Sequence, residues 1–425
     1  MKSTTKRTAE SSFSTMFRAL RSPNYRLFYF GQTASITGTW MQRVASGWLI
    51  YRLTNDPFML GLIDFASQLP VLLLSSFAGV IADRRNKRTI MMITQILAML
   101  QATILAVLVI SGEVKIWHIA LLNTCMGIIN SFDMPVRQAF TVQMIEKKED
   151  LGNAIALNSS IIHIGRLIGP PIAGILIAAF GEGVCFAVNA LSYTAILAAL
   201  FNMRLIEKTV NKIRRPVMHE LKEGFSYVAH MPPIRNALLF LVMANLFAIP
   251  FIALMPVFVR DVLLLGPKAL GFLTGSIGVG ALCGVMIMAS RRNAKGLEKM
   301  IPKAAIVFSS GLLLLSLVRS VLTAPFALAL CGMGMMMLVN STNTLIQTLV
   351  DDDKRGRVMS IYTMAFMGMA PFGSLIAGSM ASRWGAQSMV YVGGLVCIAG
   401  AYVFSRLLPD MAPHIVIKDS ESENA

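Results

Sequence analysis

About twelve long apolar runs constrain this chain more than any other feature of its sequence. Each run has the roughly 20 residues that an α-helix needs to cross the hydrocarbon of a bilayer. The runs cover residues 26–53, 58–82, 89–111, 115–137, 152–180, 183–204, 235–259, 268–290, 301–319, 323–350, 357–381 and 385–407. Glycine and proline are frequent inside them, as in packed, kinked membrane helices and unlike the alternating strands of barrels. We therefore predict an all-α integral membrane protein with 12 transmembrane helices.

The basic residues follow the same alternation of runs and loops. Of the 38 lysines and arginines, 30 fall in the termini and in alternate loops, six fall in the other loops, and Arg43 and Arg166 lie inside runs. Cytoplasmic loops of membrane proteins carry such an excess of basic residues. We therefore expect a multi-pass protein of the bacterial inner (plasma) membrane with both termini in the cytoplasm. The net charge of +16 then reflects topology, and we expect no nucleic-acid partner.

The N-terminal segment, the cysteines and the lack of catalytic motifs narrow the interpretation further. Residues 1–25 are polar and basic and lack the apolar core of a signal peptide, so we expect a retained cytoplasmic tail. The five cysteines lie inside apolar runs without metal-ligand spacing, and we interpret them as small core residues. The sequence has no P-loop and no nucleophile–base pair. We expect no enzymatic activity, no metal and no cofactor.

An internal repeat divides the chain into two halves. A shift of 207 residues lays ADRRN at 82–86 on ASRRN at 289–293, and a shift of 210 lays Gly61 on Gly271. A shift of 204 lays IAG at 172–174 on IAG at 376–378. Six helices are therefore duplicated. We expect a tail at 1–25, a six-helix bundle at 26–204, a cytoplasmic linker with an amphipathic helix at 205–233, a second bundle at 234–407 and a tail at 408–425.

A charged loop follows the second run and reads GVIADRRNKR. It resembles Gly-x-x-x-Asp-Arg-x-Gly-Arg-Arg, the signature loop of the major facilitator superfamily of transporters. Five positions match: Gly79, Asp83, Arg84, Lys87 and Arg88. Asn86 stands where the family usually has glycine, a mild departure because asparagine tolerates left-handed backbone.

A second motif lies in the fifth run, where GRLIGPPIAG resembles Gly-x-x-x-Gly-Pro-x-x-Gly-Gly of the exporting, antiporter branch of the superfamily. It matches at Gly165, Gly169, Pro170 and Gly174, with Ala173 in place of a glycine. The stretches FRALRSPNYRLFYFGQTAS and DMPVRQAF resemble the secretion-effector group, which includes enterobactin exporters.

These resemblances imply two six-helix bundles that export a small organic molecule, siderophore-like or amphipathic and drug-like, by proton antiport with alternating access. The expected partners are this small molecule, protons and the lipid bilayer, and we expect a monomer. A lipid or lysophospholipid facilitator of the same fold and a non-transporting membrane receptor stay open as alternatives.

The signature loop implies a latch between the halves. A carboxylate at Asp83 can face the positive amino-terminal end of another helix, and the family resemblance implies the helix that begins near Gly356. Asp133 reaches the same depth in the fourth run. Three basic residues are candidates to bridge the two acids: Lys87, Arg88 and Arg137. Alternatively, the basic residues of the loop serve only as topology anchors.

Three charges lie inside apolar runs of the first half, where a charge needs a partner or water. The helical rise places Arg43 and Asp64 at one level and Arg166 near the midplane. We interpret Asp64 as the proton carrier and Arg43, Arg166 and His163 as further coupling candidates. The alternatives are a static Arg43–Asp64 pair that only fixes packing and a hydrogen-bonded core histidine. Two arginines against one aspartate favour an anionic or catecholate-like cargo.

Uncharged polar side chains inside the runs are the candidates for the walls of the substrate cavity. They are Gln32, Gln68, Asn123, Asn158 and Asn189. The methionine-rich stretch at 332–338 offers adaptable surface for a bulky substrate, or else faces lipid or core.

Overall fold

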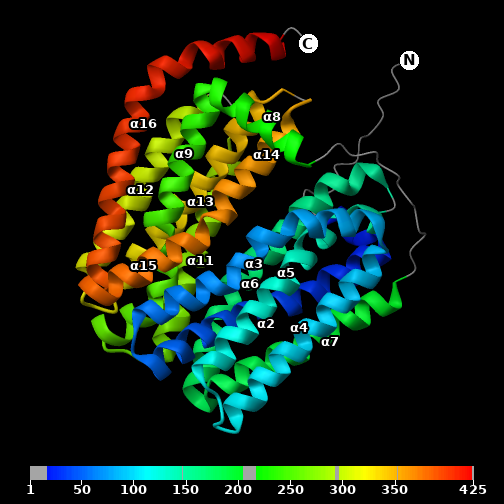
Figure 1. Cartoon of the computed structure of the whole chain (residues 1–425), viewed down its shortest axis with the longest axis vertical. Coiled ribbons are helices and arrows are strands. Elements are labelled where there is room, and N and C mark those ends of the chain that lie inside the picture. The colour runs from blue at the N-terminus through cyan, green and yellow to red at the C-terminus, as the bar shows by residue number, and fades with distance from the viewer. Residues whose placement is uncertain (1–16, 146, 204–216, 292–295, 352, 424–425) are drawn as a thin grey trace, which may run out of the picture.

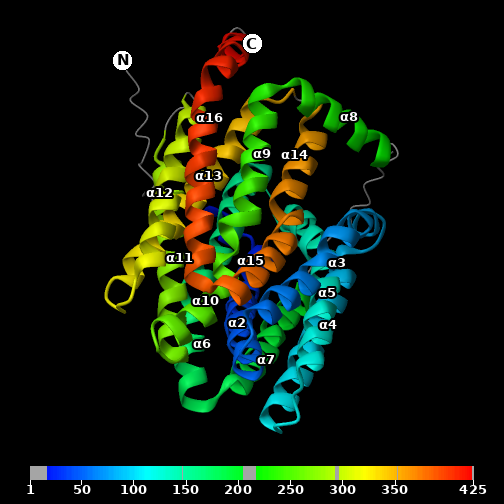
Figure 2. The same cartoon turned by 60° about the vertical axis from the view of Figure 1, so that its left-hand side comes forward.

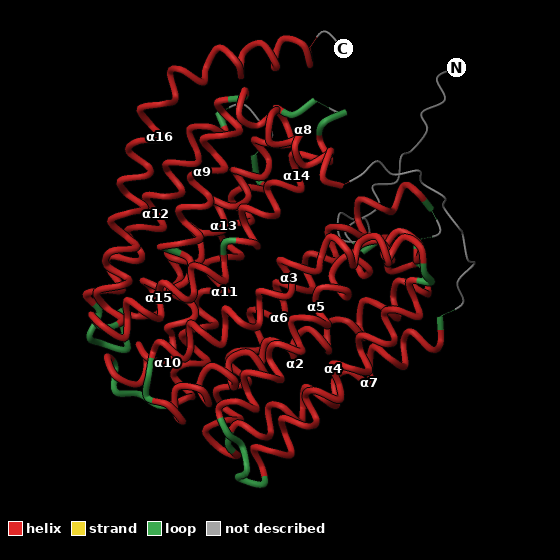
Figure 3. Tube along the Cα trace, in the orientation of Figure 1, coloured by secondary structure: helices red, strands yellow, loops and turns green. Residues whose placement is uncertain are grey.

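The structure, a computed structural model, describes residues 17–145, 147–203, 217–291, 296–351 and 353–423. All regular elements in this part of the chain are helices, as predicted (Figures 1 and 3). Eleven of the described helical segments are long and apolar enough to cross a membrane. The remaining predicted span is the first long helix, Pro23–Thr54, which is too polar to be counted among these eleven.

The first half forms one bundle, preceded by a short turn η1 (Arg18–Arg21). Its six helices are α2 (Pro23–Thr54), α3 (Pro57–Arg84), α4 (Lys87–Ile110), α5 (Ile116–Met144), α6 (Leu151–Phe180) and α7 (Glu182–Asn202), with a turn η2 (Lys148–Asp150) before α6. Asp56 caps α3 by accepting a hydrogen bond from the Phe58 amide. Proline occupies the first helical position of both α2 and α3, where no intrahelical hydrogen bond is lost.

The second half forms the other bundle after the amphipathic helix α8 (Val217–His230). Its first span is α9 (Pro232–Phe247), η3 (Ile249–Leu254), α10 (Met255–Val257) and the π-helical η4 (Phe258–Val262). Then follow α11 (Pro267–Ala289), α12 (Leu297–Leu317), α13 (Ala324–Leu349), α14 (Arg355–Thr363), the π-helical η5 (Met364–Gly368), α15 (Ala370–Trp384) and α16 (Ala386–Glu423).

Two of the predicted runs, 235–259 and 357–381, are interrupted helices in the structure. Pro250 and Pro256 lie where the first run changes its helical form, and Pro371 follows the π-helical turn of the second. Proline removes a backbone donor and clashes with the preceding turn, which accounts for these breaks. The last helix, α16, continues through the predicted tail to Glu423, and its red end turns across the top of the molecule in Figure 1.

The two bundles contact each other at the end where α2 runs into α3 and α15 into α16, which we call the far end. There Gly61 of α3 lies against Gly378 of α15, and Gly174 of α6 lies against Gly271 of α11. A Cβ on Gly61 or Gly271 would lie 2.3 or 2.4 Å from a backbone oxygen of the other bundle, so only glycine fits. The sequence repeat pairs Gly61 with Gly271 and Gly174 with Gly378, so the two crossings are pseudo-symmetric copies.

The bundles separate toward the opposite end, where α2 begins and α16 ends, which we call the termini end (Figures 1 and 2). One apolar core runs through the second bundle and includes Leu49 and Phe186 from the far end of the first. A separate core around Tyr25, Phe28 and Phe140 contains residues of the first bundle alone. The described conformation is therefore closed at the far end, and the backbones of the two bundles lie farther apart toward the termini end.

Candidate functional site

Polar side chains from three helices meet close to the α3–α15 crossing. Asp64, about two turns into α3, lies with its Oδ1 3.9 Å from Nη2 of Arg43 on α2. Gln68 donates a hydrogen bond from Nε2 to Asp64 Oδ2 at 2.6 Å. Ser374 of α15 donates a second hydrogen bond to the same oxygen. The carboxylate of Asp64 is therefore held by donors from both bundles.

The second arginine, Arg166 of α6, is joined to this group through an indole ring. The guanidinium carbons of Arg43 and Arg166 lie 5.6 and 5.7 Å from the centre of the Trp40 ring, within cation–π range. Trp40 packs against α6, where a Cβ on Gly165 or Gly169 would lie 2.9 or 2.7 Å from Trp40 atoms. Two glycines of the predicted helix 5 motif thus make room for the side chain of Trp40, whose ring contacts both arginines.

The charges of this site do not balance. Within the described part of the chain, Arg43 pairs with Asp64, whereas no acidic side chain forms an ion pair with Arg166. The Arg43 side chain is 58% exposed, whereas the Asp64 side chain is 23% exposed. A charge at the centre of a membrane helix costs about 2.5 to 3.5 kcal/mol on insertion scales, so an unpaired arginine at this depth calls for a function.

The other polar candidates occupy different places. Asn123 donates to Ser46 Oγ at 2.9 Å, and Asn158 and His163 are half-buried on α6. Asn189 is fully buried and donates to Gln42 Oε1 at 2.8 Å. Gln32 is 2% exposed. In this conformation Gln32 and Asn189 therefore lie inside the first bundle and do not face the space between the bundles.

The predicted latch residues lie toward the termini end. Asp133 is buried and accepts hydrogen bonds from Thr94 and Gln95, and Arg137 Nη1 lies 3.7 Å from its Oδ2. Arg88 donates instead to the backbone oxygen of Phe201 at 2.9 Å. Lys87 begins α4 and is half-buried. The side-chain surroundings of Asp83 and Arg84, and the exposure of Gly79, all at the end of α3, are outside what the structure describes, so the bridge between the two acids stays a prediction.

The start of α14, the expected partner of Asp83, makes another contact in this conformation. Glu223 of α8 pairs with Lys354 at 2.6 Å and with Arg357 at 2.7 Å, and Tyr227 donates to Asp351 at 3.1 Å. The hydrogen bond that Lys354 donates to the Glu223 carboxylate raises the pKa of Lys354 above its ordinary value. The amphipathic helix of the linker thus holds the first turn of α14 to its own half of the molecule.

Sequence reasoning missed three contributors to these contacts: Trp40, Ser374 and Glu223. Trp40 had a usable signal, because it lies three residues before Arg43 and therefore on the same face of α2. Ser374 and Glu223 had none, since each meets its partner from a remote part of the chain.

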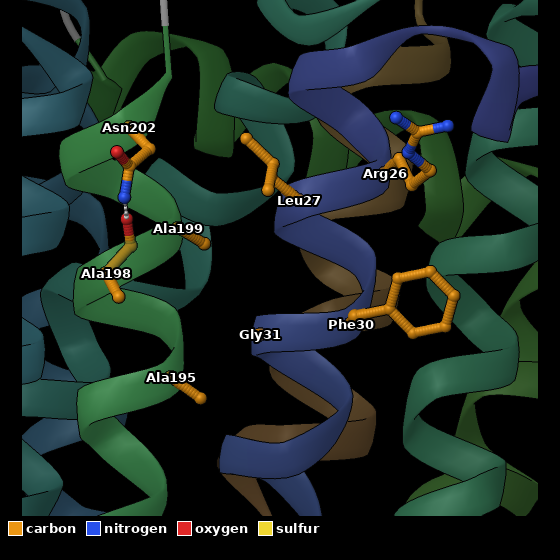
Figure 4. Close-up of a pocket in the computed structure, with 8 residues that line it drawn as sticks. All are labelled: Arg26, Leu27, Phe30, Gly31, Ala195, Ala198, Ala199 and Asn202. Carbon is orange, nitrogen blue, oxygen red and sulfur yellow. Dashed lines mark hydrogen bonds between the residues drawn. The ribbon is translucent and has the colours of Figure 1, made fainter.

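A surface groove of about 430 Å³ lies between α2 and α7 near the termini end (Figure 4). Its lining is Arg26, Leu27, Phe30, Gly31, Ala195, Ala198, Ala199 and Asn202. Phe30 is 61% exposed and lies about 140° around α2 from Arg43, at 100° per residue. The groove therefore faces away from the charged group, as expected of a lipid-facing surface.

Sequence comparison finds relatives along nearly the whole chain. The family model described as transmembrane secretion effector matches residues 14–422. The staphyloferrin A transporter of Staphylococcus aureus is 27% identical over 387 residues, which cover 89% of this chain and 95% of that protein. The multidrug efflux pump Tap of Mycolicibacterium fortuitum is 23% identical over 383 residues, covering 87% and 92%. Macrolide efflux protein A of Streptococcus pyogenes is 20% identical over 389 residues, covering 88% and 95%.

Comparison of structures finds the same fold in solved transporters. The nucleoside transporter NupG superposes with a TM-score of 0.71 at 10% identity, over 91% of this chain and 99% of that one. A bacterial homologue of the human lysosomal transporter Spinster gives a TM-score of 0.64 at 14% identity, over 94% and 97%. The fold is that of the major facilitator transporters, and the family match covers both halves. The chain therefore belongs to the transmembrane secretion effector family of the major facilitator superfamily, a family of multi-pass membrane transporters.

Proposed function

We propose that this protein exports a small organic molecule across the bacterial plasma membrane by proton antiport, with both termini in the cytoplasm. The observation that carries the proposal is the position of Asp64. It is an acid inside a membrane-spanning helix, it pairs with Arg43, and it hydrogen-bonds across the interface between the bundles. A titratable group at the contact that opens and closes is suited to couple proton movement to that motion.

The relatives support export as the direction and small molecules as the cargo. Their names include a staphyloferrin A transporter, a multidrug efflux pump and a macrolide efflux protein. A siderophore-like or amphipathic drug-like cargo is the corresponding proposal for this chain. The excess of basic residues in the termini and alternate loops supports a cytoplasmic position for the termini end.

The contacts suggest how the proton would move. With the far end closed, Ser374 and Gln68 donate hydrogen bonds to the Asp64 carboxylate. When the bundles part at the far end, Ser374 leaves with α15 and the charged form loses one donor. A proton is then taken up from outside and released inside after the far end closes again. The cargo travels in the opposite direction when the same two states alternate.

The first experiment identifies the cargo in cells. Mass spectrometry compares spent medium and cell extract from the source bacterium with and without the gene, grown with and without iron. If, only under iron starvation, cells lacking the gene have less of a chelator in their medium and more of it in their extract, the cargo is a siderophore. If no compound shifts in either condition, drug tolerance and lysolipid uptake become the assays.

The second experiment tests coupling with that compound. In energised inverted vesicles, cargo addition should release protons through the wild-type protein and through Glu113→Gln, which changes an exposed loop carboxylate. Asp64→Asn should abolish this cargo-driven proton movement, because an amide neither gains nor loses a proton at this pH. Unchanged proton movement in Asp64→Asn excludes Asp64 as the carrier. Transport that persists at full rate after the gradient is collapsed favours a facilitator instead.

A further inference from the structure

Arg166 differs from the other arginine of the site because it has no acidic partner among the described residues. Arg43 has Asp64 at 3.9 Å, whereas Arg166 has its guanidinium carbon 5.7 Å from the Trp40 ring centre. Both guanidinium groups lie beside the same indole ring, so the two like charges repel each other. An aromatic ring orients a guanidinium but leaves its formal charge uncompensated.

The surroundings of Arg166 are built to keep it in place. Gly165 and Gly169 bring α6 so close to α2 that Trp40 packs between the helices. On its other side α6 crosses α11, where a Cβ on Gly278 would lie 3.1 Å from the backbone oxygen of Arg166. The residue thus belongs to a tightly packed stretch of helix at the interface of the two bundles, and its position is set by the fold.

We propose that Arg166, oriented by Trp40, binds an anionic group of the transported molecule, such as a carboxylate or a phenolate next to a planar ring. A guanidinium binds carboxylates with paired donors, and the indole offers a flat apolar surface beside it. Of the charges in this group, Arg166 is the one that a cargo anion would neutralise. This inference rests on the proposed transport function and adds the chemical class of the cargo.

The contacts also separate the anion site from the proton site. They run from Asp64 to Arg43, from Arg43 to Trp40, and from Trp40 to Arg166. Arg43 thus stands between the carboxylate and the proposed cargo anion and offsets the repulsion between them. His163, one turn before Arg166, adds no negative charge to the site in either of its protonation states.

Equilibrium binding to the full-length protein in lipid nanodiscs tests the proposal without a proton gradient. The probes are two matched pairs: citrate with trimethyl citrate, and 2,3-dihydroxybenzoate with its amide. Binding is followed by tryptophan fluorescence and by the shift in Tm. At least one charged probe should bind, and its neutral partner should bind about tenfold more weakly, as expected when a charge-assisted hydrogen bond is lost.

The variants assign the preference to one residue. Arg166→Gln should weaken the charged probe about tenfold and leave its neutral partner within about twofold. Arg166→Lys keeps the charge without the planar fork and should lose less, which covers the case in which the glutamine variant fails to fold. Arg26→Gln, at the exposed end of α2, is the control and should bind both probes like the wild type.

Two results overturn the proposal: charged probes that bind no better than their neutral partners, or a charge preference that survives in Arg166→Gln. Failure of the proposed proton antiport is distinguishable from both. In that case Asp64→Asn moves protons like the wild type in vesicles, while the charge preference and its loss in Arg166→Gln are still seen in nanodiscs.

Discussion

At the scale of single residues, the hydrogen bond from Ser374 to Asp64 links a charged residue of the first bundle to a helix of the second bundle. The two residues are 310 positions apart, and Ser374 is 4% exposed. A hydrogen bond to a charged group contributes about 1.5 to 3 kcal/mol, more than a bond between neutral partners. This bond exists only while the far end is closed, so it should favour the described conformation.

Replacing Ser374 tests that bond. Ser374→Ala should shift the equilibrium toward the state open at the far end by about tenfold or more. Electron–electron distances between spin labels at Lys115 and Arg319, in a background without the five native cysteines, report the shift. Ser379→Ala is the control, because that hydroxyl donates to Leu375 O of its own helix. Distance distributions that match the wild type would show that the bond does not influence the gate.

At the scale of elements, α8 and the start of α14 form a clasp within the second half of the chain. Glu223 pairs with both Lys354 and Arg357, whose side chains are 26% and 17% exposed. Because Glu223 raises the pKa of Lys354, the charged pair is fully present below the ordinary lysine pKa and is lost only as pH rises through the raised value. The clasp is therefore intact at neutral pH.

Glu223→Gln should loosen α8 from α14. Amide hydrogen exchange in Val217–His230 should become about two- to fivefold faster, the range expected for a partly exposed ion pair. Lys222→Gln, an exposed neighbour on the same helix, should leave exchange unchanged. Equal exchange in wild type and Glu223→Gln would mean that apolar packing alone holds the helix.

At the scale of the whole molecule, two pseudo-symmetric crossings close the far end. The α3–α15 crossing uses Gly61 and Gly378, and the α6–α11 crossing uses Gly271 and Gly174. Both pairs leave no room for a side chain between the helix backbones. Gly174 is also the last glycine of the helix 5 motif, so that motif shapes one crossing as well as the pocket for Trp40.

Alanine at either crossing should open the far end. Gly61→Ala and Gly271→Ala each place a methyl group against backbone of the other bundle, and overpacking of this kind costs about 1 to 3 kcal/mol. The spin-label distances between positions 115 and 319 should therefore lengthen in both variants to a similar extent. Gly152→Ala is the control, since nothing lies within 4 Å of its Cβ position. A shift in one variant alone would argue against equivalent crossings.

The fold was largely predictable because the bilayer constrains the sequence directly. A spanning helix needs an unbroken apolar run, and most runs begin and end within a few residues of the observed helices, although α16 continues past 407 to Glu423. The breaks at Pro250 and Pro371 were not placed, since proline marks where a helix can kink without saying whether its neighbours restore the lost contacts. The level shared by Arg43 and Asp64 followed from helical rise, because both helices are continuous between the far end and these residues.

By itself, the sequence determined the apolar helices, their repeat along the chain and the common level of Arg43 and Asp64, because each depends on position along one helix. Apart from the Arg43–Asp64 pair, the tertiary structure alone decided which side chains of the site meet across helices. Trp40 joins two arginines, Ser374 reaches Asp64, and Glu223 holds the start of α14 through helix rotations and crossings that no spacing within one helix encodes. These contacts exist only when both bundles are packed together, and they carry the proposals for proton coupling and cargo binding.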